Sequence, residues 1–218
     1  MKASNAPRQI CLAAALTIIW SHAASAPHLE PCDRLMDDYY RRVERLMRDA
    51  WPEGMQLLVI MYIPPAERGL GLTPDKDGFK LVRLELDPSL WYSSWRDVKG
   101  SVPKRQVQDF SGTRARIAKL SFPISDRLAV ALLDAFERSA ATAKPDVSDD
   151  IIADGYTYEI LLPERSCVRL RDPPPASDAG AIADLVRFLE QAALSWQPRK
   201  REAFEAEVEE RIAMIRRD

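Results

Sequence analysis

The segment MQLLVIMYI, residues 55–63, is an almost unbroken apolar run with the length of a β-strand. The sequence WPEG at 51–54 precedes it and two prolines at 64–65 follow it, and both sequences are typical chain breakers. A strand that is apolar at nearly every position is typical of the interior of a sheet, where both faces are covered. The sequence therefore predicts a sheet with this strand inside it.

Further strands are expected on either side of this segment. Residues 79–86 place three apolar side chains on one face, as a half-buried strand does. Residues 66–78 contain three glycines and are interpreted as a loop, so strands 55–63 and 79–86 are expected to pair as a hairpin with a long connection. Additional strands are predicted at 106–110, 115–122, 156–162 and 167–171.

Apolar residues at helical spacing predict three amphipathic helices, at 32–51, 126–141 and 177–196. Ser125 and Ser177 stand where their hydroxyl groups can cap the second and third of these helices. A charged helix is expected at 198–218, with a narrow apolar stripe formed by Phe204, Val208 and Ile212. We therefore expect an α+β fold: a mixed, mainly antiparallel sheet packed by three amphipathic helices, plus a charged C-terminal helix.

Composition favours one folded domain, because 46% hydrophobic and 29% charged residues are close to globular averages. We assign this single α+β domain to residues 32–197 and treat 198–218 as a separate helical segment. The apolar stripe of that segment has two interpretations. It can dock on the domain, or it can bind a partner as an amphipathic helix does.

The N-terminus has the features of a secretory signal peptide. Lys2 and Arg8 form a basic region, residues 10–20 are apolar, and small residues follow. We predict cleavage after Ala23, a flexible segment at 24–31, and a periplasmic or secreted mature protein. The apolar run is too short for a stable membrane anchor, which needs about 20 residues.

The overall charge argues against nucleic acid as a partner. The formal net charge is −2, and cleavage removes two basic residues and no acid. The mature chain therefore lacks the positive field that binding to phosphate backbones requires.

Two cysteines, Cys32 and Cys167, remain after Cys11 leaves with the signal peptide. In an oxidising compartment such a pair is typical of a disulfide bond, which we predict here. A bond closing so long a loop would stabilise the fold by roughly 5 kcal/mol in chain-entropy models. The alternative is a nucleophilic Cys167, which would need a nearby base to form its thiolate.

The folded part of the chain contains no histidine, because the only two are His22 in the signal peptide and His28 just after it. Catalysis by Ser-His-Asp or Cys-His pairs and zinc sites with histidine ligands are thereby excluded. The sequence also lacks a phosphate-binding Gly-Lys-Ser/Thr motif, and we expect neither a cofactor nor a metal. The run DKDG at 75–78 is better explained as a hairpin turn than as a calcium loop, which would need a glutamate where Leu84 stands.

Two function classes stay open. An envelope hydrolase could use paired carboxylates, for example Glu85 with Glu159, or a serine activated by a lysine. An exported domain without imidazole, cofactor motif or basic field is better explained as a binding or inhibitory protein that acts on a protein partner such as a toxin or a hydrolase. The candidate contacts are the aromatic side chains Trp91, Tyr92 and Trp95 and the stripe Phe204, Val208 and Ile212, although both sets also suit a buried core.

The predicted export can be tested directly. Protein recovered from the cell envelope should begin near Ala24 by N-terminal sequencing, and the same protein, denatured without reductant, should titrate for no free thiol. Both results follow from transport into an oxidising compartment. A cytosolic protein that retains Met1, or one with two reactive thiols per chain, would contradict the export argument and the disulfide respectively.

Overall fold

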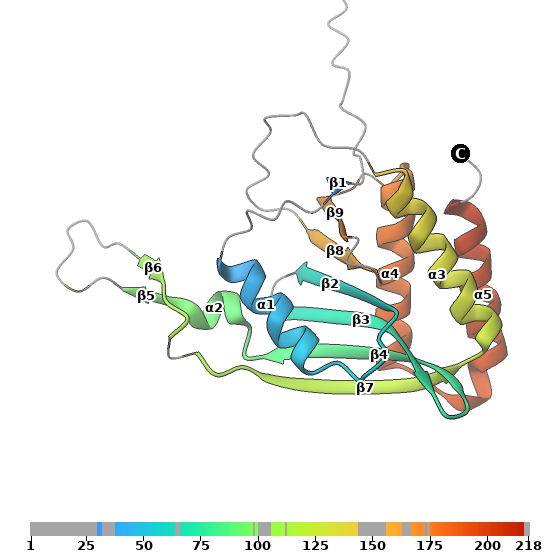
Figure 1. Cartoon of the computed structure of the whole chain (residues 1–218), viewed down its shortest axis with the longest axis horizontal. Helices are drawn as coiled ribbons and strands as arrows, with labels where there is room; N and C mark the ends of the chain where they lie inside the picture. The colour runs from blue at the N-terminus through green and yellow to red at the C-terminus, as the bar shows by residue number, and fades with distance from the viewer. Residues whose placement is uncertain are drawn as a thin grey trace, which may run out of the picture.

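The computed structural model describes residues 30–31, 38–63, 66–97, 99, 106–111, 113–143, 156–162, 167–171, 173 and 175–215 of the 218-residue chain. This part of the chain has the predicted α+β fold (Figure 1). Its main sheet is antiparallel throughout and has seven strands in the order β1-β9-β8-β2-β3-β4-β7. The strand predicted from the run 55–63 is β2, and it lies in the middle of this sheet.

The strands of the main sheet are β1 (Glu30–Pro31), β2 (Leu57–Ile63), β3 (Ala66–Asp75), β4 (Gly78–Asp87), β7 (Arg116–Ile124), β8 (Thr157–Leu161) and β9 (Cys167–Arg171). A separate two-stranded ribbon consists of β5 (Trp95–Asp97) and β6 (Gln106–Gln108). The helices are α1 (Asp38–Asp49), α2 (Leu90–Ser94), α3 (Asp126–Ala141), α4 (Asp178–Leu194) and α5 (Arg201–Ile215), with a 3-10 turn, η2 (Pro198–Lys200), before the last.

Two hydrophobic cores cover the two faces of the sheet. Alternate residues of β2, beginning with Leu57, pack beneath α3, α4 and α5. The intervening residues, beginning with Leu58, pack beneath α1 together with side chains of β4. Figure 1 shows α3, α4 and α5 grouped together, with α1 set apart from them. The three predicted amphipathic helices are thus confirmed as α1, α3 and α4, and Ser125 and Ser177 cap the last two as expected.

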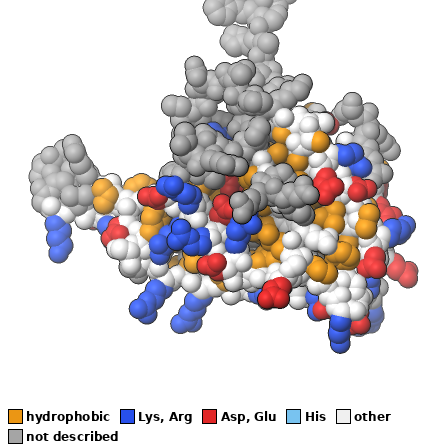
Figure 2. Space-filling view, in the orientation of Figure 1, with side chains coloured by type: hydrophobic (Ala, Val, Ile, Leu, Met, Phe, Trp, Pro, Cys, Tyr) orange, Lys and Arg blue, Asp and Glu red, His pale blue; other side chains and the backbone are white. Residues whose placement is uncertain are grey.

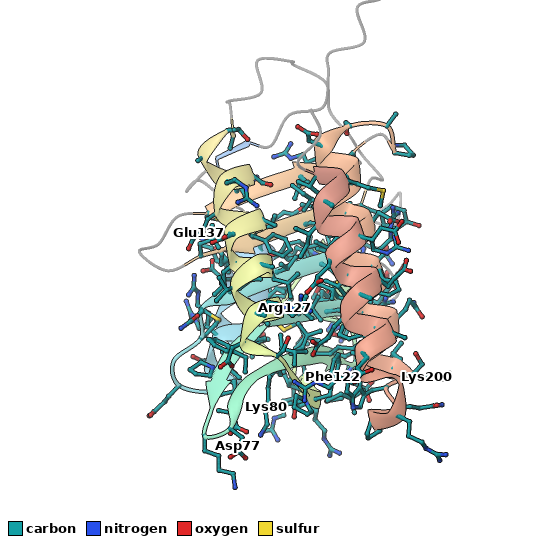
Figure 3. All side chains as sticks on the ribbon, turned by 90° about the vertical axis from the view of Figure 1, so that its right-hand side faces the viewer. Asp77, Lys80, Phe122, Arg127, Glu137 and Lys200 are labelled. Carbon is teal, nitrogen blue, oxygen red and sulfur yellow. The ribbon has the colours of Figure 1, made fainter. Side chains whose placement is uncertain are left out.

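The C-terminal helix α5 docks on the domain, so its apolar stripe is not an exposed partner surface. Phe204, Val208 and Ile212 are all buried in the core beneath α3 and α4. Figure 3 shows α3 and α5 side by side, with Phe122 of β7 near their lower ends. The Phe122 ring stacks on Trp196 with the ring centroids 4.1 Å apart, and it meets Phe204 edge-on at 5.6 Å. The stripe therefore completes the core, because docking removes the surface of three apolar side chains, each one helical turn from the next, from contact with water.

Glu205 adds a polar contact to this docking. Its carboxylate accepts hydrogen bonds from the Ser125 amide at 2.9 Å and the Ser125 hydroxyl at 2.6 Å, at the start of α3. Arg201 also donates to it, at 2.9 Å. Burial alone would raise the pKa of the Glu205 carboxyl, but the bonds from Ser125 and Arg201 outweigh it and hold the pKa below its usual range. The ionised Glu205 thus ties α5 to α3.

The prediction of a loop at 66–78 is wrong, because residues 66–75 form β3. This strand pairs with β2 on one side and β4 on the other, so β2 and β4 do not form the expected hairpin. Gly69 and Gly71, which suggested a loop, are strand residues on the face that α1 covers. They leave room for Met47 and Trp51 at the end of α1.

The run 75–78 forms the turn between β3 and β4, as the hairpin interpretation expected. Asp75 pairs with Gly78, which leaves Lys76 and Asp77 as a two-residue loop. Gly78 has a φ of 125°, a conformation that residues with a side chain rarely adopt.

Of the two glycines on this face, Gly71 tolerates a side chain less well. A Cβ there would lie 2.0 Å from the Leu57 carbonyl oxygen and 2.7 Å from the Trp51 ring. We expect Gly71→Ala to lower the free energy of unfolding by about 3 kcal/mol, because backbone and ring must both move.

The matched control is Gly69→Ala. Its Cβ would first meet the Met47 sulfur at 3.1 Å, and a methionine side chain can move aside. We expect a change within about 1 kcal/mol, measured by denaturant unfolding of both variants. Equal losses in the two variants would contradict this account of the interface between α1 and β3.

Candidate partner-binding surface

The aromatic segment 90–95 forms the short helix α2 and the first residue of β5. In Figure 1 this unit and the β5–β6 ribbon extend from the left end of the sheet, away from α3, α4 and α5. The short strand predicted at 106–110 corresponds to β6, whereas the sequence did not predict helix α2.

Two of the three aromatic side chains in this segment are exposed. Tyr92 is 57% exposed and Trp91 is 38% exposed, whereas Trp95 is half-buried. Leu90 and Ser94 are buried, so α2 directs these two residues inward and presents Trp91 and Tyr92 to the outside. The two interpretations of the segment thus apply to different residues: Leu90 belongs to the core, and Trp91 and Tyr92 remain candidate contacts.

The exposed Trp91 ring is held by other rings. Its centroid lies 5.1 Å from that of Tyr39 on α1 and 5.5 Å from that of Trp95, both in edge-on arrangements. Tyr39 also stacks on Phe110, with the centroids 6.4 Å apart. Edge-on aromatic contacts of this kind are favourable beyond the area they bury, so Trp91 has a fixed orientation before any partner arrives.

A buried carboxylate, that of Glu67 on β3, anchors α2. Its Oε1 accepts hydrogen bonds from the Trp91 amide at 2.7 Å and from the Tyr39 hydroxyl at 2.8 Å. The Ser89 hydroxyl donates to it at 3.1 Å and the Leu90 amide donates to Oε2 at 2.9 Å. The first amides of a helix have no partner within the helix, and a helix of five residues has little stability of its own. Glu67 therefore sets the position of α2 on the sheet.

Sequence reasoning missed Glu67 because it lies in the segment interpreted as a loop. Once 66–75 is known to be a strand, Glu67 shares a face with Gly69 and Gly71 and must point toward α1 and α2. No local signal in the sequence marks it as an anchor, since its four donors come from parts of the chain more than 20 residues away.

A second polar network lies on the same face of the sheet, beneath α1. Glu159 on β8 accepts hydrogen bonds from the Tyr62 hydroxyl at 2.6 Å and from Arg169 at 2.8 Å. Glu159 and Arg169 are directly opposed across β8 and β9 and form a cross-strand ion pair. Burial raises the pKa of the Glu159 carboxyl, although the bonds from Tyr62 and Arg169 oppose the shift. This network joins β2, β8 and β9.

The carboxylate pair considered for hydrolysis does not come together. Glu85 belongs to the face covered by α3 and α4 and accepts a hydrogen bond from Arg83 at 2.5 Å, whereas Glu159 belongs to the opposite face. Strands β2 and β3 also separate β4 from β8. Two carboxylates on opposite faces of a sheet cannot flank one substrate.

The serines of α2 have local partners. Ser93 Oγ donates to the Ser89 carbonyl at 2.6 Å, and Ser94 Oγ donates to the Trp91 carbonyl at 3.0 Å. Such bonds to the preceding turn are ordinary for serine in a helix. They occupy the hydroxyl protons that a lysine base would have to remove.

Within the described residues, no three His, Cys, Asp or Glu side chains are grouped so that they could hold a metal ion. Cys167 is half-buried on β9, beside the core under α1. Cys32 and the predicted signal peptide lie outside the described residues.

Basic side chains gather near the aromatic surface. Figure 2 shows Lys and Arg concentrated on the lower left of the molecule, the side of α1, α2 and the neighbouring end of β7. Exposed basic residues of these and the adjoining elements include Arg45 of α1, Arg96 of β5 and Arg116 at the start of β7. A partner with acidic groups would therefore be attracted to this side.

Comparison with protein-family models, with curated proteins and with solved structures finds no match to this chain. Among the described helices, none has both the length and the apolar character needed to cross a membrane.

The anchoring by Glu67 can be tested with Glu67→Gln. A glutamine amide places N–H groups where one of the helix amides or hydroxyls now donates, so at least one buried donor loses its partner. We expect the free energy of unfolding to fall by about 2–3 kcal/mol and the near-ultraviolet signal of the tryptophans to change.

Glu85→Gln serves as the control, because Glu85 is partly exposed and its main partner, Arg83, retains Glu190. A loss of no more than about 1 kcal/mol is expected there. If Glu67→Gln lowers the free energy of unfolding by no more than Glu85→Gln does, Glu67 does not anchor α2.

Proposed function

We propose that this protein is exported and acts without catalysis, by binding a protein partner in the periplasm or outside the cell. A secreted toxin or a hydrolase is the kind of partner that fits. The main support is the exposure of Trp91 and Tyr92 on a helix that a buried carboxylate holds in place. Exposed apolar groups that adjoin one another, as Trp91 and Tyr92 do in the sequence, are typical of protein interaction sites.

The energetics of interfaces support the same surface. A few aromatic side chains contribute most of the binding free energy in protein complexes. Ordering a side chain on binding costs about 0.5–1.5 kcal/mol, and a side chain that is already fixed avoids much of that cost. Trp91, which packs on Tyr39 and Trp95, is such a side chain.

The proposal includes the disulfide between Cys32 and Cys167, and the strand register supports it. Pro31 of β1 pairs with Val168 of the antiparallel strand β9. In the sequence Cys32 follows Pro31 and Cys167 precedes Val168, so the described pairing ends one residue short of each cysteine. Neighbouring strands have the spacing that a disulfide requires. The bond would fasten the start of the mature chain to the sheet.

The decisive test is Tyr92→Ala. A partner captured from envelope extract with the wild-type protein should bind this variant about tenfold more weakly, because the most exposed aromatic contact is removed. The thermal midpoint should stay nearly unchanged, since Tyr92 contributes little to the core. Trp91→Ala should instead lower both affinity and stability, because its ring also packs on Tyr39.

Val130→Ala is the matched control, an exposed apolar residue on α3 that lies outside the proposed surface. This variant should change neither the affinity for the partner nor the thermal midpoint. Equal affinity of Tyr92→Ala and the wild type would refute the surface. Turnover of envelope polysaccharide or peptide that a single carboxylate change abolishes would replace the binding function with a hydrolase.

A further inference from the structure

Strand β7 forms one edge of the main sheet in the part of the chain that the structure describes. It pairs with β4 along its whole length, from Arg116 opposite Asp87 to Ile124 opposite Phe79. Figure 1 shows β7 along the lower border of the sheet, with no ribbon of a described element beyond it. An edge strand carries backbone N–H and C=O groups that are available for a further strand.

Pro123 shows which residues of β7 carry these groups. Proline has no N–H, and in a sheet it is found on edge strands with its nitrogen facing away from the neighbouring strand. Residue 123 therefore faces outward. In an antiparallel pair, alternate residues direct both backbone groups to the partner or both away from it. Ile117, Lys119 and Ser121 then also face outward, and their N–H and C=O groups form a short ladder that ends at Pro123.

The side chains along this edge are open to solvent. Residues 118–121 are exposed on both faces, among them Leu120 at 45%. Residues 113–124 themselves carry charge of one sign, because they include Arg114, Arg116 and Lys119 and no acid, while the acids Asp87 and Glu85 of β4 lie on the inner side of the strand, opposite Arg116 and Ala118. All three basic side chains are exposed.

Two kinds of strand could pair with this edge: the same edge of a second copy of the chain, or a strand of another protein. The positive charge of the edge favours one of them. A second copy of the chain paired edge to edge would bring these basic groups against the same set, which is unfavourable. A strand with glutamate or aspartate would instead place opposite charges across the pair. We propose that the outer edge of β7 binds an extended, acidic segment of a partner protein as an additional antiparallel strand.

This proposal does not depend on the aromatic surface of α2. Backbone groups give the affinity in strand addition, and side-chain pairs give the preference for an acidic sequence. The edge can therefore be tested with a peptide, without the partner that Tyr92 and Trp91 would contact.

The probe is a blocked peptide of the same length as β7 that alternates glutamate with valine, compared with one in which lysine replaces glutamate. Ser121→Pro removes one outward N–H and leaves the ladder to β4 intact. Ser121→Val keeps the N–H and serves as its matched control. Peptide affinity and amide exchange of residues 117, 119 and 121 are measured for each protein.

We expect the acidic peptide to bind the wild type and Ser121→Val and to slow exchange at the outward amides. Ser121→Pro should bind it about tenfold more weakly, because a hydrogen bond is lost and the ring obstructs the incoming strand. Lys119→Glu should also lose the acidic peptide and should gain affinity for the lysine peptide.

Several results would overturn the proposal. These are equal binding of both peptides to the wild type, binding of neither, unimpaired binding by Ser121→Pro, or dimerisation of the chain that Lys119→Glu strengthens. Slow exchange of the Ser121 amide in the wild-type protein without peptide would mean that its N–H pairs with β4, which would also refute the outward assignment. The peptide experiment does not bear on the Tyr92→Ala test, so the proposal for β7 and the proposal for the aromatic surface can be refuted independently.

Discussion

Every side chain of β2 from Leu57 to Tyr62 is at most 6% exposed, so both faces of this strand must be covered. A strand side chain points alternately to one face and the other, which means that no single layer of helices can bury it. The layer of α3, α4 and α5 covers one set of side chains, and α1 covers the other. The remaining strands extend the sheet outward from β2 until the helices no longer cover it. Gly69 and Gly71 belong to the same constraint, because Met47 and Trp51 pack against β3 at these two positions, where side chains are missing.

Four glutamates are buried among the described residues, and besides Glu205 of α5 these are Glu67, Glu159 and Glu190, each with basic or polar donors around it. Glu190 of α4 accepts from Arg68 at 2.7 Å and from Arg83 at 3.2 Å, beneath the helices. Glu159 accepts from Arg169 and Tyr62 on the other face. Buried charges are costly unless they are paired, so these contacts also specify which strands and helices meet. Glu67 differs from the other two because backbone amides of α2 donate to it. It links the interior of the sheet to an exposed segment.

The described surface is consequently uneven. On the side of α3 and α5, Phe204 is buried and the half-buried Trp196 packs on it, so the aromatic rings join the core there, although single aliphatic residues such as Val130 stay exposed. At the opposite end, α2 leaves two aromatic rings exposed, and β7 leaves one border of the sheet without a described neighbour. Basic side chains lie close to both features (Figure 2). This distribution is why interaction with other proteins, rather than chemistry at a cleft, is the function proposed here.

How much the sequence determined differs from element to element. The strand β2 and the helices α3 and α4 were predictable, because hydrophobic periodicity and a serine cap are local signals. The strand β3 was not predictable, because its glycines suggest a loop unless Trp51 and Met47 are known to pack against them. The docking of α5 had two interpretations, since a narrow apolar stripe serves a core and a partner equally well.

For the aromatic segment 90–95 as well, the sequence predicted one part of the outcome and the tertiary structure decided the other. The sequence by itself identified Trp91, Tyr92 and Trp95 as candidates, because large aromatic residues contribute to cores and interfaces alike. Only the tertiary structure decided which of them face outward. The outcome depends on Glu67, whose carboxylate gathers donors from segments far apart along the chain. Such contacts have no local pattern, since they arise only after the sheet has brought those segments together.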